Sequence, residues 1–150
     1  MSDKNFTQKN WSSWHHLLHK EILSKKTLIP TGSNILISVS GGQDSMALLT
    51  LINDLKKLHK WSISVWHGDH QWHQKSSIYA LELQSYCEEK KISFYFDKAN
   101  KENIFSEEKA RDWRYKKLCV RAKTLLKKNQ QQKNIYLLTG HTSSDNSETF

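Results

Sequence analysis

The stretch SVSGGQDSMALL, from Ser38 to Leu49, contains two of the five glycines of the chain, placed side by side. A short β-branched apolar run precedes the pair, and a helical pattern of apolar residues follows it. The sequence therefore predicts a loop that runs from a strand into the N-terminus of a helix. Free backbone N–H groups and the helix dipole attract anions at such a point, and two glycines let the backbone wrap a phosphate group.

Polar side chains beside the two glycines favour phosphate binding over a simple capped turn. Ser40 and Ser45 offer hydroxyl donors, whereas the Asp44 carboxylate would repel phosphate unless a cation bridges them, which suggests Mg²⁺. No lysine follows the glycines, so this is not the G-x-x-x-x-G-K-[ST] phosphate loop. The candidate phosphate-binding residues are Ser40, Gly41, Gly42, Gln43, Asp44 and Ser45.

The bulk composition limits the class of protein. A length of 150 residues suits one domain, and 37% hydrophobic with 11% aromatic residues argues for a folded chain. No apolar run approaches the length that crosses a bilayer, which excludes an integral membrane protein. The formal charge of +8 favours a polyanionic partner, although solvated lysine-rich helix faces give the same charge. Cys87 and Cys119 stand far apart in helical patterns, so we expect both to be reduced and semi-buried.

Short apolar runs and helical patterns alternate along the chain. The predicted strands are 35–40, 63–66, 92–96 and 135–139, and the predicted helices are about 10–27, 45–59, 76–90 and 106–128, with another beginning at 144. Strands that alternate with helices in this way imply right-handed crossovers, so we expect an α/β fold with a parallel sheet and helices on both faces. Residues 1–150 form one domain, whose sheet part begins near residue 33.

The remaining glycines and histidines fall near the predicted strand ends. Gly68 follows the second predicted strand and Gly140 the fourth, at the edge of a parallel sheet where ligands bind. His67, His70 and His73 recur every third residue beside an aspartate, which raises the question of a metal site. Because this stretch reads as a loop and no further Cys or His cluster supports zinc, we favour a nucleotide-facing loop with His70 near the substrates.

Several motifs in order resemble a known family. SGGQDS resembles the PP-loop of the N-type ATP pyrophosphatases, which split ATP into AMP and pyrophosphate while activating a carbonyl oxygen. The stretches HGDHQWH (67–73), ARDWRY (110–115) and TGHTSSDNSET (139–149) together resemble the tRNA(Ile)-lysidine synthetases of the cyanobacterial and plastid branch. The resemblance runs from about Trp11 to Phe150. It differs at His73, where that family more often has arginine, which puts a phosphate contact there in doubt.

The resemblance implies a two-step ligation of the C–N bond-forming class. ATP adenylates the C2 oxygen of the wobble cytidine in the CAU-anticodon tRNA(Ile) and releases pyrophosphate, with Mg²⁺ as the accompanying cation. Free L-lysine then displaces AMP at that carbon. The product, lysidine, changes the codon and amino-acid specificity of the tRNA from Met/AUG to Ile/AUA.

The resemblance also supplies candidate catalytic and substrate residues. Arginines suit phosphate oxygens, and carboxylates suit the ammonium group of lysine. Without the resemblance, Arg111 and Arg114 would be interpreted as part of a solvated helix face. Asp145 and Glu148 would be interpreted as caps at a helix N-terminus, and His141 as a histidine at a strand end that bonds to the backbone. The candidates are His70, Arg111, Arg114, His141, Asp145 and Glu148.

Two alternatives stay open. A tRNA thiolase of the same PP-loop family usually needs paired cysteines, and Cys87 and Cys119 form no C-x-x-C. A non-catalytic basic RNA-binding fragment is the other, although the intact SGGQDS motif argues against it. Family members carry more sheet and further helical domains that hold tRNA, so we expect an N-terminal part truncated before the last strand.

The expected location also comes from the resemblance. Composition rich in Lys, Asn and Ile, with no transit peptide, fits a plastid-encoded stromal protein, and the bacterial cytoplasm is the alternative. The sequence does not indicate the oligomeric state.

Overall fold

A computed structural model describes residues 29–40, 43–70, 76–100, 106–128 and 134–139, without the side chains of Gln43 and Asp44. The helices predicted at about 10–27 and from residue 144 lie outside these ranges. The elements are β1 (Asn34–Ser38), α2 (Gln43–His59), β2 (Ser62–Asp69), α3 (Ser76–Glu89), β3 (Ser93–Lys98), α4 (Glu107–Lys128) and β4 (Ile135–Thr139). None of the helices in these ranges is long and apolar enough to span a membrane.

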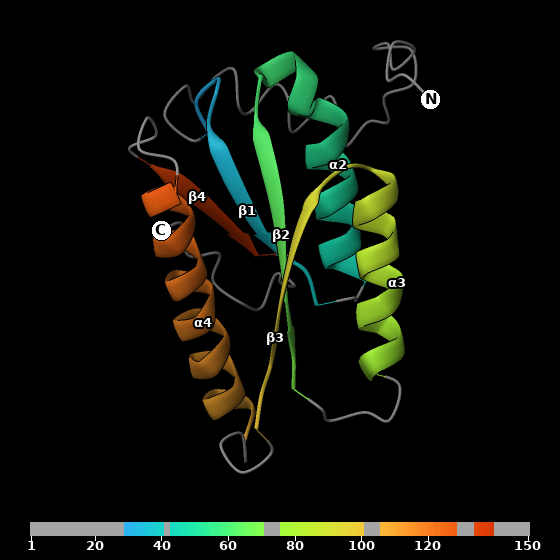
Figure 1. The fold of residues 1–150 in the computed structure, drawn as a ribbon, viewed down its shortest axis with the longest axis vertical. Helices are drawn as coiled ribbons and strands as arrows, with labels where there is room; N and C mark the ends of the chain where they lie inside the picture. Colours follow the sequence, from blue (N-terminus) through green and yellow to red (C-terminus); the bar gives the residue numbers. More distant parts are fainter. Residues whose placement is uncertain (1–28, 41–42, 71–75, 101–105, 129–133, 140–150) are drawn as a thin grey trace.

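The four described strands form one parallel sheet in the order β3-β2-β1-β4. Helices α2 and α3 cover one face of the sheet, and α4 covers the other (Figure 1). This arrangement confirms the predicted α/β class with helices on both faces. All four strands end at the same edge of the sheet, so the loops that follow them converge there.

The strand alternation divides the core into two layers. Ile35 and Ile37 of β1 pack with Leu49 and Leu83 on the side of α2 and α3. Leu36 lies between them in sequence and packs on the opposite side, with Trp66, Leu118, Ala122 and Leu137. Because side chains of a strand alternate between faces, even-numbered residues of β1 and β2 point toward α4. This alternation therefore decides which strand residues reach the α4 side of the sheet, where the candidate site lies.

The two helices that cover the first face end in the same way. Lys60 after α2 has a φ of 56° and Lys91 after α3 a φ of 58°, both left-handed. The next residue then donates its backbone N–H five residues back, from Trp61 to Lys56 and from Ile92 to Cys87, at 2.9 and 2.8 Å. This is the pattern of a helix C-cap in which the left-handed residue turns the chain sharply. Each cap delivers a buried residue directly to the start of the next strand.

The strand boundaries differ from the sequence-based ones in one instructive place. β2 runs to Asp69, so His67, Gly68 and Asp69 belong to the strand, and their prediction as a loop was wrong. They pair in register with Phe96, Asp97 and Lys98 of β3, which supplies the backbone hydrogen bonds that an isolated polar stretch would lack. β1 ends at Ser38, two residues earlier than predicted, and β3 begins at Ser93 rather than at residue 92.

The cysteines are free, as expected, but only Cys119 has the predicted partial burial. Both are free; Cys87 is fully buried in α3 and Cys119 is half-buried in α4. Burial raises the pKa of the Cys87 thiol to about 11, so it stays protonated and unreactive at neutral pH.

Candidate active site

A pocket opens at the carboxyl edge of the sheet, on the side of α4. Its volume of about 90 Å³ is below the range of roughly 300–1,000 Å³ of whole small-molecule sites, so it accounts for part of a ligand. The lining residues come from three adjacent strands, from the segments that follow two of them, and from α4. They are Ser38, Val39, Ser40, Trp66, Gly68, His70, Arg114 and Thr139.

The alternation along β2 explains how three of these residues share one face. Trp66, Gly68 and His70 are spaced two apart, so all three point toward α4. The indole of Trp113 on α4 packs there, with its ring centroid 6.0 Å from that of Trp66. A Cβ on Gly68 would lie 2.4 Å from Trp66 and 2.8 Å from Trp113, closer than any real Cβ contact. Glycine is therefore required at this point for the two indoles to meet beside the pocket.

His70 lies between that aromatic pair and a cationic side chain. Its ring makes an edge contact with Trp113 at 5.3 Å between centroids, and Arg114 lines the same pocket. Burial and the Arg114 charge lower the pKa of His70 to about 4, with His67 acting in the same direction and Asp69 opposing it. The imidazole is therefore neutral at pH 7 and can accept a hydrogen bond from a bound ligand.

The lowered pKa of His70 predicts a pH-dependent stability. In the unfolded chain this histidine titrates near its usual value of 6.5, so between pH 6.5 and 4 the unfolded state binds more protons. Stability is thus full above pH 6.5 and falls as the pH drops toward 4. We expect His70→Asn to lose less stability than the parent between pH 7 and pH 4.5 in urea unfolding. Equal losses in the two proteins would contradict this assignment.

The candidate phosphate loop is closed by a pair of serines. The backbone N–H of Ser40 donates to Ser45 Oγ at 3.2 Å, and the two hydroxyl oxygens lie 3.1 Å apart. Ser45 is 1% exposed, so its hydroxyl holds the start of α2 against the end of β1. Ser40, in contrast, is exposed and lines the pocket. Ser40 thus lies at the pocket, and α2 begins three residues further along the chain, at Gln43.

The two predicted arginines occupy different places. Arg114 lines the pocket, whereas Arg111 is not among its lining residues and lies with its guanidinium carbon 5.6 Å from the ring centre of Tyr115. Arg114 is also the one residue of the lining set that carries a charge at neutral pH. The structure therefore places Arg111 and Arg114 in different surroundings, although the sequence predicted a functional role for both.

Several predicted residues cannot be placed. His141, Asp145 and Glu148 lie outside the described residues, as do Gly41, Gly42, Gly140 and His73, and the side chains of Gln43 and Asp44 are not described. Among the described residues there is no group of three His, Cys, Asp or Glu side chains arranged to hold a metal. The proposed Mg²⁺ ligand therefore stays a prediction.

His67 has a structural environment of its own. It is 4% exposed, its ring stacks on Phe96 at 5.9 Å, and its Nδ1 donates to the carbonyl oxygen of Val39 at 2.6 Å. This hydrogen bond ties β2 to the segment that enters the candidate phosphate loop. His67 thus points away from the pocket while holding one of its walls.

Some lining residues were missed at the sequence level. Ser38, Trp66 and Thr139 were interpreted only as parts of strands or of a motif. Trp113, which contacts His70 beside the pocket, was interpreted only as part of a helix. The period-two spacing of Trp66 with Gly68 and His70 was a usable signal, because it puts all three on one face once the strand is extended to Asp69.

Comparison with known proteins supports one family. Residues 14–150 match the family described as the PP-loop domain. A tRNA(Ile)-lysidine synthase of the cyanobacterium Prochlorococcus marinus subsp. pastoris is 73% identical over the whole chain, which covers 45% of that relative. A chloroplastic tRNA(Ile)-lysidine synthase of Pyropia yezoensis is 33% identical over 88% of the chain and 39% of its own length. The chain thus spans less than half the length of these relatives.

A solved structure shares the fold. The U34-tRNA thiolase NcsA from Methanococcus maripaludis, with its [4Fe-4S] cluster, superposes with a TM-score of 0.53. The match covers 89% of this chain and 48% of that chain, at 17% sequence identity. At this identity the likeness concerns the fold alone.

Proposed function

Because this chain belongs to the PP-loop domain family, we propose that it forms the ATP-binding part of an enzyme that ligates lysine to C2 of the wobble cytidine of the CAU-anticodon tRNA(Ile). The resemblance first drawn from SGGQDS and the later motifs agrees with the names of the relatives. The structural observation that carries the proposal is the pocket where Ser40, neutral His70 and Arg114 meet at the carboxyl edge of the sheet.

The geometry suits the adenylation step. A backbone loop that opens at the pocket and leads into the N-terminus of α2 provides N–H donors for the phosphates of ATP, with Gly41 and Gly42 allowing close approach. Arg114 lines the same pocket and stabilises negative charge as pyrophosphate leaves. Bound Mg²⁺ would neutralise phosphate charge, with Asp44 as its candidate ligand. Asp145 and Glu148 remain the predicted contacts to the ammonium group of lysine, and His141 remains a candidate catalytic or substrate residue.

The thiolase alternative is disfavoured by the placement of the cysteines. Cys87 packs among the residues between the sheet and helices α2 and α3, whereas Cys119 packs on the α4 side. Two thiols on opposite faces of a sheet cannot act as a pair. The relatives named as lysidine synthases favour ligation further.

The expected cellular location is inferred from the similar proteins. Similar proteins come from cyanobacteria, and a more distant relative is chloroplastic. We therefore favour the bacterial cytoplasm, which was the alternative at the sequence level, over the plastid stroma.

The test uses the full-length protein that contains these residues. Pyrophosphate release from ATP and transfer of labelled lysine are measured with a CAU-anticodon tRNA(Ile) transcript and with the same transcript carrying uridine at the wobble position. We expect both signals only with the cytidine transcript. Sulfur transfer with a sulfur donor would move the assignment to a thiolase, and RNA binding without pyrophosphate release would leave a binding protein.

A further inference from the structure

Most of the excess positive charge of the chain lies on one helix. α4 contains nine Lys and Arg against three Asp and Glu, a net charge of +6, while the whole chain carries +8. α3, on the opposite face of the sheet, contains three glutamates and no Lys or Arg, a net charge of −3. α2, on the same face as α3, contains two Asp and two Lys, so the helices on the two faces of the sheet carry net charges of opposite sign, and a polyanion would approach the α4 face.

The lysines of α4 that follow Asp112 have no acidic partner among the described residues. After Asp112 the helix contains no acidic residue up to its end at Lys128. In this stretch five lysines are exposed, and no acidic group of the described residues lies within salt-bridge distance of them. We refer to them as the lysine band: Lys116, Lys117, Lys123, Lys127 and Lys128.

Helix geometry arranges this charge in two adjacent rows. At 100° per residue, Lys116, Lys123 and Lys127 share the outward face. Lys117 and Lys128 lie on the flank, in line with Arg114 and with Arg121, which contacts Asp97 of β3 at 3.9 Å. With a rise of about 1.5 Å per residue, the flank row extends about 21 Å from Arg114, enough for several successive phosphates.

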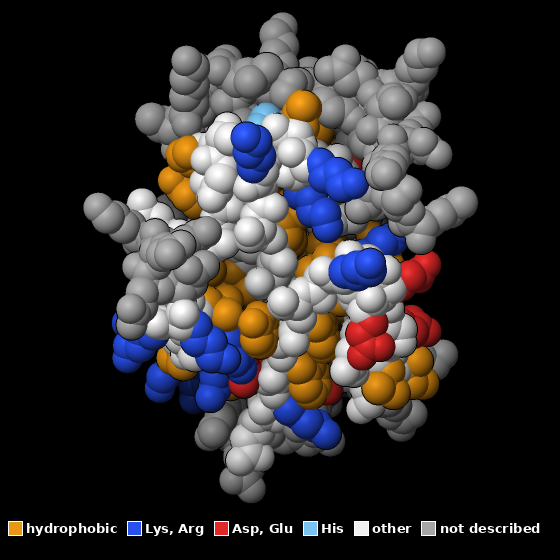
Figure 2. Space-filling model, turned by 45° about the horizontal axis from the view of Figure 1, so that its top comes forward, with side chains coloured by type: hydrophobic (Ala, Val, Ile, Leu, Met, Phe, Trp, Pro, Cys, Tyr) orange, Lys and Arg blue, Asp and Glu red, His pale blue; other side chains and the backbone are white. Residues whose placement is uncertain are grey.

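The usual reasons for helical lysines do not explain this band. The helix dipole favours cations only in the last turn, which accounts for Lys127 and Lys128 but not for the three before them. Lys123 and Lys127 are four apart, so their like charges repel and weaken the helix. Figure 2 shows Lys and Arg side chains gathered at the lower left, on the side of the molecule where α4 lies. Binding of a polyanion relieves the repulsion between the lysines of the band.

We propose that the lysine band binds the phosphate backbone of the RNA substrate, next to the pocket at the carboxyl edge of the sheet. This rests on the proposed function, because it takes the RNA to be the substrate of the same site. Arg114 connects the two: it lines the pocket and begins the flank row of the band. Contacts of this kind hold RNA in position without reading its sequence.

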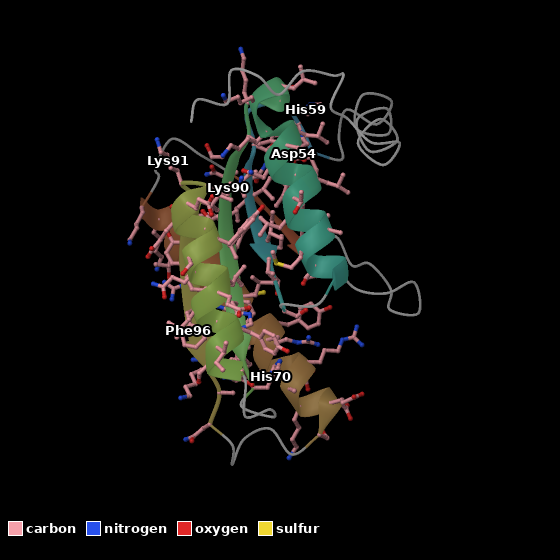
Figure 3. The ribbon with its side chains drawn as sticks, turned by 90° about the vertical axis from the view of Figure 1, so that its right-hand side faces the viewer. Asp54, His59, His70, Lys90, Lys91 and Phe96 are labelled. Carbon is pink, nitrogen blue, oxygen red and sulfur yellow. The ribbon has the colours of Figure 1, made fainter. Side chains whose placement is uncertain are left out.

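The test compares two variants of the full-length protein that lose the same charge. The band variant is Lys116→Gln, Lys123→Gln and Lys127→Gln. The control variant is Lys60→Gln, Lys90→Gln and Lys91→Gln, which lie at the ends of α2 and α3; Lys90 and Lys91 are far from His70 in Figure 3. Binding of the tRNA transcript is measured by fluorescence anisotropy over a range of salt, and binding of ATP is measured alongside.

We expect the band variant to bind RNA about tenfold to a hundredfold more weakly, with the slope of log K against log salt reduced by about 2 to 3. The control variant and both ATP affinities should match the parent. Equal weakening in both variants would reduce the effect to overall charge and overturn the proposal. Unchanged RNA binding by the band variant would also overturn the proposal. If binding to phosphatidylserine vesicles fell in that variant instead, the lysine band would bind a membrane surface rather than RNA. If the parent protein is active and the band variant binds RNA as well as the parent does, the ligase assignment stands and only the lysine-band proposal fails. If the parent binds no RNA, both proposals fail.

Discussion

Arg114→Gln is expected to lower the rate of the adenylation step by about 10²–10³-fold, the typical cost of removing one group that stabilises transition-state charge. Among the residues that line the pocket, Arg114 supplies the charge at neutral pH. No lysine in the candidate phosphate loop shares that role. The measurement is single-turnover release of pyrophosphate with saturating ATP and tRNA.

Arg111→Gln is the matched control for this prediction. It removes the same charge from the same helix, one turn earlier, from a residue that contacts Tyr115 and is not among those lining the pocket. Its rate should fall by less than about tenfold. A loss as large as that of Arg114→Gln would show that the charge of the helix, rather than its position at the pocket, matters.

A second readout separates a pocket role from a folding defect. The Arg114 charge helps to lower the pKa of His70 to about 4, so its removal should raise that pKa toward 6.5. NMR titration of the histidine rings would detect the shift in a folded protein. Arg114→Lys keeps the charge and so should keep the low pKa, while losing bidentate contact to phosphate and part of the rate.

Gly68→Ala is expected to destabilise the protein by about 1–3 kcal/mol, the usual cost of overpacking a filled site. The added methyl group would lie 2.4 Å from the buried ring of Trp66 and 2.8 Å from the partly buried ring of Trp113, both beside the pocket. For a domain of this size the melting temperature should fall by about 2–4 °C per kcal/mol. His70, two residues further along the chain and just past the end of β2, should lose its ordered contact with Trp113.

Two further variants test the cause. Gly32→Ala places a methyl group where no atom lies within 4 Å, so it has only the cost of a left-handed φ of 82°, about 1 kcal/mol. Combining Gly68→Ala with Trp113→Leu should recover part of the stability lost by Gly68→Ala, since the leucine vacates the space. Strictly additive losses in this double-mutant cycle would mean that the indole is not what excludes the methyl group.

The fold was largely predictable because its signals are local. The glycine pair after one apolar run, and three further runs separated by helical patterns, indicated four parallel strands, and these strands are present. The end of β2 was not predictable in the same way. His67, Gly68 and Asp69 have a polar and glycine-containing composition, and they become a strand only because β3 pairs with them.

The site was predictable in its residue types but not in its geometry. Arg111 and Arg114 look equivalent in sequence, and only the packing of α4 against the sheet puts one of them at the pocket. Trp113 carries no chemical signal, yet it packs against His70 and requires glycine opposite. Contacts between residues more than 40 positions apart cannot be read from a local pattern.

The order of strands in the sheet has a consequence for synthesis of the chain. β1 lies between β2 and β4, and Asn34 pairs with Ile135, which is translated 101 residues later. At about 5–20 residues per second, the ribosome needs about 5–20 s to deliver that partner. During this interval β1, three of whose five residues are buried, has one open edge, which is the kind of surface that pairs with other chains. Protection of that edge in the cell therefore determines what fraction of the newly synthesised protein folds.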